Sequence, residues 1–95
     1  MTATTTAFAP TTSASRYLQQ LCKHWAHKMP VDFTPEAGTI TFPSGAVARL
    51  QAHTDRIEVH IATPNDDMIP TMREVVARHL DRFAFREAPL QFVWS

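Results

Sequence analysis

A thiol and two imidazoles occur within the six positions CKHWAH, from Cys22 to His27. These are ligand types that zinc takes in proteins. On a helix, Cys22 lies about 160° from His24 and about 140° from His27, whereas the two imidazoles are only about 60° apart. One metal ion therefore cannot join the thiol to both rings. Cys22 is predicted to be a core residue, and His24 and His27 remain a candidate two-ligand site for iron or another metal.

His79 falls among the apolar positions of a later helical segment. A buried imidazole needs a hydrogen-bond partner for each polar nitrogen. Two interpretations are open: His79 is a core histidine bonded to a backbone carbonyl or to Tyr17, or it lines a pocket between the helices and a sheet. His79 and Tyr17 are therefore candidate ligand-binding residues.

His60 is predicted to lie opposite Arg49 of the neighbouring strand and close to Glu58 of its own strand. The three residues form either an acid/base cluster or a set of solvated cross-strand charges, and Arg49 and His60 are candidate ligand-binding residues. Only Gly38 and Gly45 are available for a phosphate loop, and both are assigned to turns. No serine, histidine and aspartate arrangement can be placed, so we expect a protein that is not an enzyme.

Two segments have the apolar spacing of amphipathic helices. The first begins at Ser13, a favourable N-cap residue, and ends before Pro30. Its apolar residues recur every three or four positions: Ala14, Leu18, Leu21, Cys22, Trp25 and Met29. The second follows an Asn-Asp-Asp cluster and accepts Pro70 only in its first turn. Its apolar side consists of Ile69, Met72, Val75, Val76, His79, Leu80 and Phe83.

The middle of the chain has the alternation of four strands joined by turns. The turns are predicted at residues 35–38, 43–45 and 54–55. They set apolar residues opposite one another: Val31 with Phe42, Phe33 with Ile40, Phe42 with Ala46, Ile40 with Ala48, Ala48 with Ile61, Leu50 with Val59 and Ala52 with Ile57. A slip of one residue would mix the two faces of the sheet, so the turns agree on one buried and one polar face.

Strand propensity is moderate from Thr4 to Ala9, and residues 1–10 are expected to be an edge strand or a loose arm. Leu90 to Trp94 can close the sheet as a last strand. The predicted fold is an α+β two-layer sandwich, a mainly antiparallel sheet of five to six strands with two helices on one face, in the order β-α-β-β-β-β-α-β. Seven residues are expected on the uncovered face: Thr39, Thr41, Val47, Arg49, Gln51, Glu58 and His60.

The composition favours a single domain over residues 1–95, which can bury roughly 60 to 65% of the surface that its unfolded chain exposes. Nine basic and nine acidic residues give a formal net charge of zero, so no broad field attracts nucleic acid or anionic lipid. No apolar run approaches the about 18 residues of a membrane span, and the start does not have the pattern of a secretory signal. A single cysteine forms no internal disulfide, and we expect a cytoplasmic protein with neither nucleic-acid nor membrane partners.

Two blocks, SRYLQQLCKHW at residues 15–25 and HLDRFAFRE at residues 79–87, resemble in order and spacing a small bacterial family known as domain of unknown function 2218. The resemblance covers nearly the whole chain and brings no established catalytic or ligand residues. It implies a link with iron uptake, because similar domains occur joined to or beside siderophore-interacting reductases. The dihydroxyheptenedioate aldolase name given to some relatives does not fit, since that enzyme is a much longer barrel.

Two functional hypotheses follow. In the first, the domain is an accessory or interaction module in iron or siderophore utilisation, which self-associates or docks another protein through the exposed sheet face or a sheet edge. In the alternative, it binds a small ligand or an iron complex in a pocket near His79 or at His24 and His27. Three arginines near the end of the second helix either stabilise that end or bind an anion: Arg78, Arg82 and Arg86. No other cofactor is expected.

Overall fold

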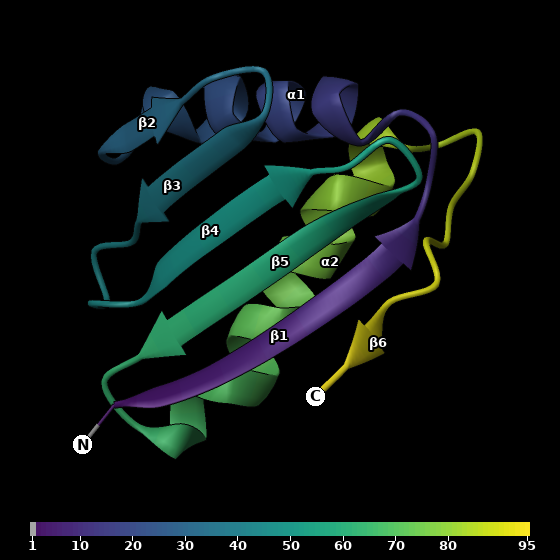
Figure 1. The fold of residues 1–95 in the computed structure, drawn as a ribbon. Coiled ribbons are helices and arrows are strands. Elements are labelled where there is room, and N and C mark those ends of the chain that lie inside the picture. The colour runs from purple at the N-terminus through teal and green to yellow at the C-terminus, as the bar shows by residue number, and fades with distance from the viewer. Residues whose placement is uncertain (1) are drawn as a thin grey trace.

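Six antiparallel strands form one sheet, and two helices cover a single face of it (Figure 1). The computed structural model describes residues 2–95. Along the chain, the elements are β1 (Ala3–Pro10), α1 (Ala14–Ala26), β2 (Val31–Phe33), β3 (Ala37–Thr41), β4 (Val47–Ala52), β5 (Arg56–Thr63), the short 3-10 helix η1 (Asp66–Met68), α2 (Ile69–Phe83) and β6 (Val93–Trp94). In space, the strands follow the order β2-β3-β4-β5-β1-β6. The predicted α+β sandwich and its order of elements are confirmed.

Both helices occupy the predicted segments. Ser13 precedes α1, but its side chain makes no capping hydrogen bond; its backbone N–H donates instead to Thr11 Oγ1 at 3.1 Å. Pro70 lies in the first turn of α2, where a missing N–H costs no intrahelical bond. The last strand is shorter than predicted, because only Val93 and Trp94 pair with β1, while Leu90 is buried ahead of it.

β1 lies inside the sheet, so the expectation of an edge strand or a loose arm is wrong. It pairs with β5 along its whole length, from Ala3 opposite Thr63 to Pro10 opposite Arg56. Its other side pairs with β6, where Ala7 is opposite Trp94. Pro10 is tolerated because it stands at the last position of the strand.

The predicted registers hold for two of the three hairpins. Between β3 and β4, Ile40 faces Ala48, and between β4 and β5 all the predicted pairs form. Between β2 and β3 the prediction is wrong by two residues, since Val31 faces Ile40 and Phe33 faces Gly38. The turn there is tighter than predicted, because the Thr34 hydroxyl accepts hydrogen bonds from the backbone N–H groups of Glu36 and Ala37. A shift of two keeps the same residues on the buried face.

The two glycines have different roles. Gly45 has φ of 94° in the β3–β4 turn, as predicted. Gly38 is not in a turn but inside β3, under α1. A Cβ atom placed on Gly38 would lie 2.6 Å from Cys22 Sγ and 3.5 Å from Leu18 Cδ2. Gly38 therefore lets the helix approach the sheet closely, which is why Cys22 and Leu18 are completely buried.

Candidate functional site

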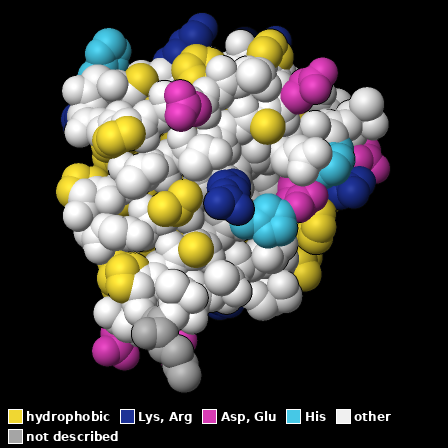
Figure 2. Space-filling view, turned by 60° about the vertical axis from the view of Figure 1, so that its left-hand side comes forward, with side chains coloured by type: hydrophobic (Ala, Val, Ile, Leu, Met, Phe, Trp, Pro, Cys, Tyr) yellow, Lys and Arg dark blue, Asp and Glu magenta, His cyan; other side chains and the backbone are white. Residues whose placement is uncertain are grey.

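The face of the sheet away from the helices is uncovered, and we call it the open sheet face. Because side chains alternate along a strand, all seven residues expected on this face are found there. Figure 2 shows basic, acidic and histidine side chains gathered near the middle of the view, with hydrophobic side chains scattered around them. A hollow of about 650 Å³ lies over the strands, and its polar lining includes Thr4, Thr6, Thr39, Arg49, Gln51 and His60.

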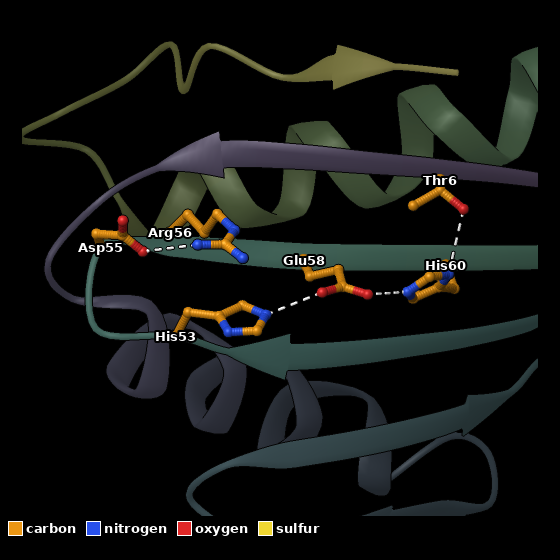
Figure 3. A network of polar contacts seen from close by, with 6 residues as sticks. All are labelled: Thr6, His53, Asp55, Arg56, Glu58 and His60. Atoms are coloured by element: carbon orange, nitrogen blue, oxygen red, sulfur yellow. Dashed lines mark hydrogen bonds and ion pairs between the residues drawn. The ribbon is translucent and has the colours of Figure 1, made fainter.

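Glu58 is the centre of a hydrogen-bonded network on this face (Figure 3). One carboxylate oxygen is 2.9 Å from His53 Nε2, and the other is bonded to His60 Nε2. The second ring nitrogen of His60, Nδ1, is 3.1 Å from Thr6 Oγ1. When Nε2 of His60 donates to Glu58 in the neutral ring, Nδ1 must accept from the threonine hydroxyl. Four side chains from β1, β5 and the β4–β5 turn are thereby held together, and the Glu58 side chain is only 16% exposed.

Hydrogen bonds from His60 and then from His53 hold the pKa of Glu58 below its ordinary value, and they outweigh the opposing effect of burial. Glu58 is therefore kept ionised by its neighbours. An ionised carboxylate that is already bonded on both oxygens offers little to a further cation or proton donor. The network thus fixes the positions of the two imidazoles more than it creates a free base.

We expect the Glu58 carboxyl to titrate below its ordinary pKa of 4.5 in the folded protein. Because folding lowers this pKa, the network stabilises the fold above the unfolded-state value, and the contribution is lost as the pH falls from about 4.5 through the folded value. Carbon-detected NMR titration of the Glu58 carboxyl measures the midpoint. A double variant, His53→Gln with His60→Gln, should return it toward 4.5, and an unchanged midpoint in that variant would contradict the assigned cause.

Arg49 is a basic residue of the open sheet face whose guanidinium is available to bind a ligand. It lies opposite His60 on the neighbouring strand, its side chain is exposed, and it makes no ion pair with any residue in 2–95. A guanidinium presents several N–H donors in one plane and favours carboxylate or phosphate groups. Arg49 and His60, two of the predicted ligand residues, are therefore brought together in the same hollow.

His53 is a member of the network that the sequence-based assignment left out. The sequence does indicate where His53 lies, because it follows Gln51 by two positions and so continues the same face of β4 into the turn. Its backbone N–H donates to the Arg56 carbonyl oxygen at 2.9 Å, and this closes the hairpin and leaves His53 near Glu58.

The other predicted site residues lie in the helical layer. His24 is half-buried between the helices, with its ring centroid 5.6 Å from that of His79, whereas His27 is exposed at the end of α1. His79 is bonded to a backbone carbonyl, as one interpretation proposed: its Nδ1 is 2.7 Å from the Val75 oxygen. The ring of His24 packs against His79 and Phe83 of α2. Within residues 2–95, no group of three or more His, Cys, Asp or Glu side chains is arranged to hold a metal ion, and the His24 and His27 pair stays a prediction.

Cys22 is a buried thiol in the core rather than a metal ligand shared with the histidines. Its side chain is completely covered, and burial raises the pKa of the thiol to about 11. A neutral thiol of this kind is a poor nucleophile and a poor metal ligand. The prediction that Cys22 is a core residue is confirmed.

Tyr17 joins neither histidine group. Its side chain is 5% exposed, and its hydroxyl donates to Glu87, which also accepts from Thr11 Oγ1 at 3.0 Å. These bonds attach the segment after α2 to the beginning of α1. Tyr17 therefore has a structural position in the helical layer.

We expect Tyr17 to ionise above its ordinary pKa of 10.0, because its hydrogen bond to Glu87 and its burial both favour the neutral phenol. Tyr17 is the single tyrosine of the chain, so an ultraviolet absorbance titration reports on it alone. Glu87→Gln removes the negative acceptor and should lower the midpoint. The same midpoint in both proteins would show that Glu87 does not control the phenol.

Together these features define a small α+β domain with one polar face of its sheet uncovered. The chain matches, over residues 6–95, the family described as "Uncharacterized protein conserved in bacteria (DUF2218)", and it belongs to this family, which confirms the resemblance of the two sequence blocks. Among solved structures it is similar to the one described as "NMR structure of PA4090 from Pseudomonas aeruginosa", with 39% sequence identity and a TM-score of 0.80 over 97% of this chain and 94% of that chain. No curated protein matches the sequence. No helix in the described part of the chain has both the length and the apolar character needed to cross a bilayer.

Proposed function

We propose that this domain is a non-catalytic interaction module that binds a partner protein across its open sheet face. The observation that carries the proposal is the exposed, unpaired guanidinium of Arg49 in a hollow lined by hydrogen-bonding side chains. The occupant that fits is an extended segment of the partner that carries carboxylates. Such a segment can lie along the strands and give Arg49 the bidentate partner that it lacks within residues 2–95.

The charge of the hollow supports an acidic occupant. Glu58 is already bonded to His53 and His60, so it does not compete for Arg49. Threonine hydroxyls and the Gln51 amide in the same hollow can donate to further carboxylate oxygens. The open sheet face therefore offers donors and one free positive charge.

A second copy of the chain is a weaker candidate for the occupant. Stable homodimer interfaces are rich in large apolar side chains, whereas the side chains that line this hollow are mostly polar or small. Two large hydrophobic side chains on it are well exposed, Phe8 at 39% and Val93 at 71%, and both lie at the β1–β6 end rather than in the hollow. A polar face of this kind suits a partner that binds and dissociates.

The setting that we propose is iron or siderophore utilisation in the cytoplasm. The support for iron is the resemblance of the two sequence blocks to domains found beside siderophore-interacting reductases, so such a reductase is the first partner to test. The support for the compartment is that the one cysteine is a free, buried thiol, as is common in reducing surroundings.

Site-specific photo-crosslinking in the bacterial cell tests the proposed surface. A crosslinking amino acid at Gln51, in the hollow, should capture one partner, whereas the same group at Gln20, exposed on α1, should not. The charge reversal Arg49→Glu should reduce capture at least about tenfold, since it replaces attraction by repulsion, and Arg16→Glu on α1 is the matched control. The crosslinked peptide should contain aspartate or glutamate.

Equal capture from Gln51 and Gln20, or equal capture by the two charge-reversed variants, would reject the open sheet face as the binding surface. Light scattering after size-exclusion chromatography tests the competing occupant. A stable dimer that Arg49→Glu dissociates would show that the face takes a second copy, and would overturn a separate partner.

The second candidate function is the binding of a small ligand or an iron complex near His79. The observation that favours it is the packing of His24 and Trp25 against His79, with ring centroids 5.6 Å and 4.7 Å from that ring. A coloured ligand at this place, such as haem or a ferric siderophore, should quench the fluorescence of Trp25. Unchanged fluorescence from Trp25 and Trp94 on adding these ligands would remove this candidate.

A further inference from the structure

A basic cavity lies where α2 crosses the end of α1, on the opposite layer from the open sheet face. The cavity has a volume of about 220 Å³ and is lined by Val75, Arg78, His79 and Arg82. These four residues share one side of α2, because they are spaced three and four positions apart. From the other helix, the ring of His24 packs against both His79 and Phe83. Two helices therefore bring basic side chains to one place.

His79 is held in a defined orientation at this cavity. Since a carbonyl oxygen can only accept, the 2.7 Å contact with Val75 makes Nδ1 of His79 a donor. The ring is also packed against Trp25, at 4.7 Å between centroids. With Nδ1 committed to the helix backbone, Nε2 is the nitrogen left for a ligand, and it becomes a donor when the ring is protonated.

The charges around His24 are of one sign. His27 and Lys28 face it from the end of α1, and His79 and Arg82 face it from α2; burial and these neighbours lower the pKa of His24. Within residues 2–95, Arg82 has no ion-pair partner.

Arg78 has only a long contact of 3.6 Å with Glu74, and both side chains are largely exposed. An exposed pair of this kind contributes little and can be exchanged for another anion. The cavity thus holds positive groups together without a buried countercharge.

Stabilisation of the helix end explains only part of this arrangement. Arg82 lies in the last turn of α2, where a cation is favoured by the helix dipole. That effect needs neither His24 from the other helix nor the fixed ring of His79. A bound anion would explain why both arginines and both histidines are gathered at this cavity.

We propose that this cavity is an oxyanion site for a dianion of the sulfate or phosphate type, held by Arg78 and Arg82 together with the imidazoles of His79 and His24. The guanidinium groups would supply paired N–H donors. His79 would add its Nε2, and His24 would add positive charge from the neighbouring helix. The site is independent of the partner surface proposed above, since it lies on the other layer of the fold.

The affinity of this site depends on pH in a defined direction. A bound dianion favours the protonated form of His24 and raises its pKa, so binding takes up a proton. By linkage, the anion binds more tightly as the pH falls toward and below the lowered pKa of His24. Sulfate is the suitable probe, because its charge stays constant across this range while that of phosphate changes.

The test is an NMR titration of the full chain with sodium sulfate at constant ionic strength, at about pH 7.5 and about pH 5.5. The imidazole signals of His24 and His79 should shift with one saturable curve, several-fold tighter at the lower pH. Arg82→Gln should weaken binding by roughly tenfold. Arg16→Gln, which removes an exposed cation from α1 outside both proposed sites, is the matched control and should leave the curve unchanged.

His24→Gln tests the share of His24 in the pH linkage and should reduce the difference between the two pH values. Repeating the titration with inorganic phosphate and with a phosphate monoester distinguishes a free ion from the end of a larger ligand, because added contacts would make the ester bind more tightly. Shifts spread over the whole surface, or equal weakening by Arg82→Gln and Arg16→Gln, would show a non-specific effect of added salt and overturn the site.

Discussion

Replacing Gly38 by Ala should destabilise the protein by about 2 kcal/mol, an unusual cost for one added methyl group. The new Cβ would lie 2.6 Å from Cys22 Sγ, 3.3 Å from Phe33 Cβ and 3.5 Å from Leu18 Cδ2. Cys22 and Leu18 are completely buried, so the sulfur has no free space to move into and α1 must lift from the sheet. Alanine also restricts the unfolded chain, but that effect is smaller, at about 0.4–1 kcal/mol. Urea unfolding followed by circular dichroism measures the change.

A double-mutant cycle identifies the contact responsible. Cys22→Ala removes the sulfur and by itself should cost about 1 kcal/mol through lost packing. In that background, the cost of Gly38→Ala should fall by more than half, because the closest clash is gone. Additive costs would show that the close approach of Cys22 to β3 is not what requires a glycine.

Replacing Trp25 by Ala should have the largest effect, a loss of about 3–5 kcal/mol in the free energy of unfolding. The indole is 4% exposed, and it packs edge-on against Phe42 at 5.0 Å and against His79 at 4.7 Å between centroids. It therefore joins α1, α2 and the start of the β3–β4 turn. Since small domains have a total stability of about 5–15 kcal/mol, this variant should be close to unfolding.

Trp94→Ala is the matched control for that variant. Trp94 is half-buried on the two-residue β6, where it stacks on Phe92 at 5.7 Å and lies under the Arg73 guanidinium at 5.3 Å. We expect its removal to cost about 1–2 kcal/mol. Equal losses from the two tryptophans would contradict the central position assigned to Trp25. Unfolding curves from circular dichroism serve here, because each variant lacks one of the two tryptophans.

Local patterns were sufficient to predict most of the fold. The spacing of apolar residues and Pro70 placed α2 correctly, and alternation with Gly45 fixed the registers from β3 to β5. The β2–β3 register was missed because a shift of two residues keeps the same face buried, so hydrophobicity does not distinguish the alternatives. The Thr34 hydroxyl bonds that select the tighter turn leave no mark on the alternation.

The sites were only partly predictable for a related reason. Arg49 and His60 are opposite one another through a hairpin register, which local rules can supply. The approach of His24 to His79 depends instead on how two helices are rotated about their axes while packed on the sheet. Each apolar stripe shows which side of its helix faces the core, but not which polar side chains meet at the crossing. Gly38 was misassigned likewise, because only the packed helix shows why it is needed.

The interior place of β1 also has a consequence for how the chain assembles. Its partners are remote in sequence: Ala3 pairs with Thr63 on one side and Ala7 with Trp94 on the other. Long loops must close before these contacts form, and a high contact order slows folding. During synthesis, the first strand must wait until β5 and then β6 have left the ribosome. Until β6 has paired, β1 presents an open edge to any neighbouring chain.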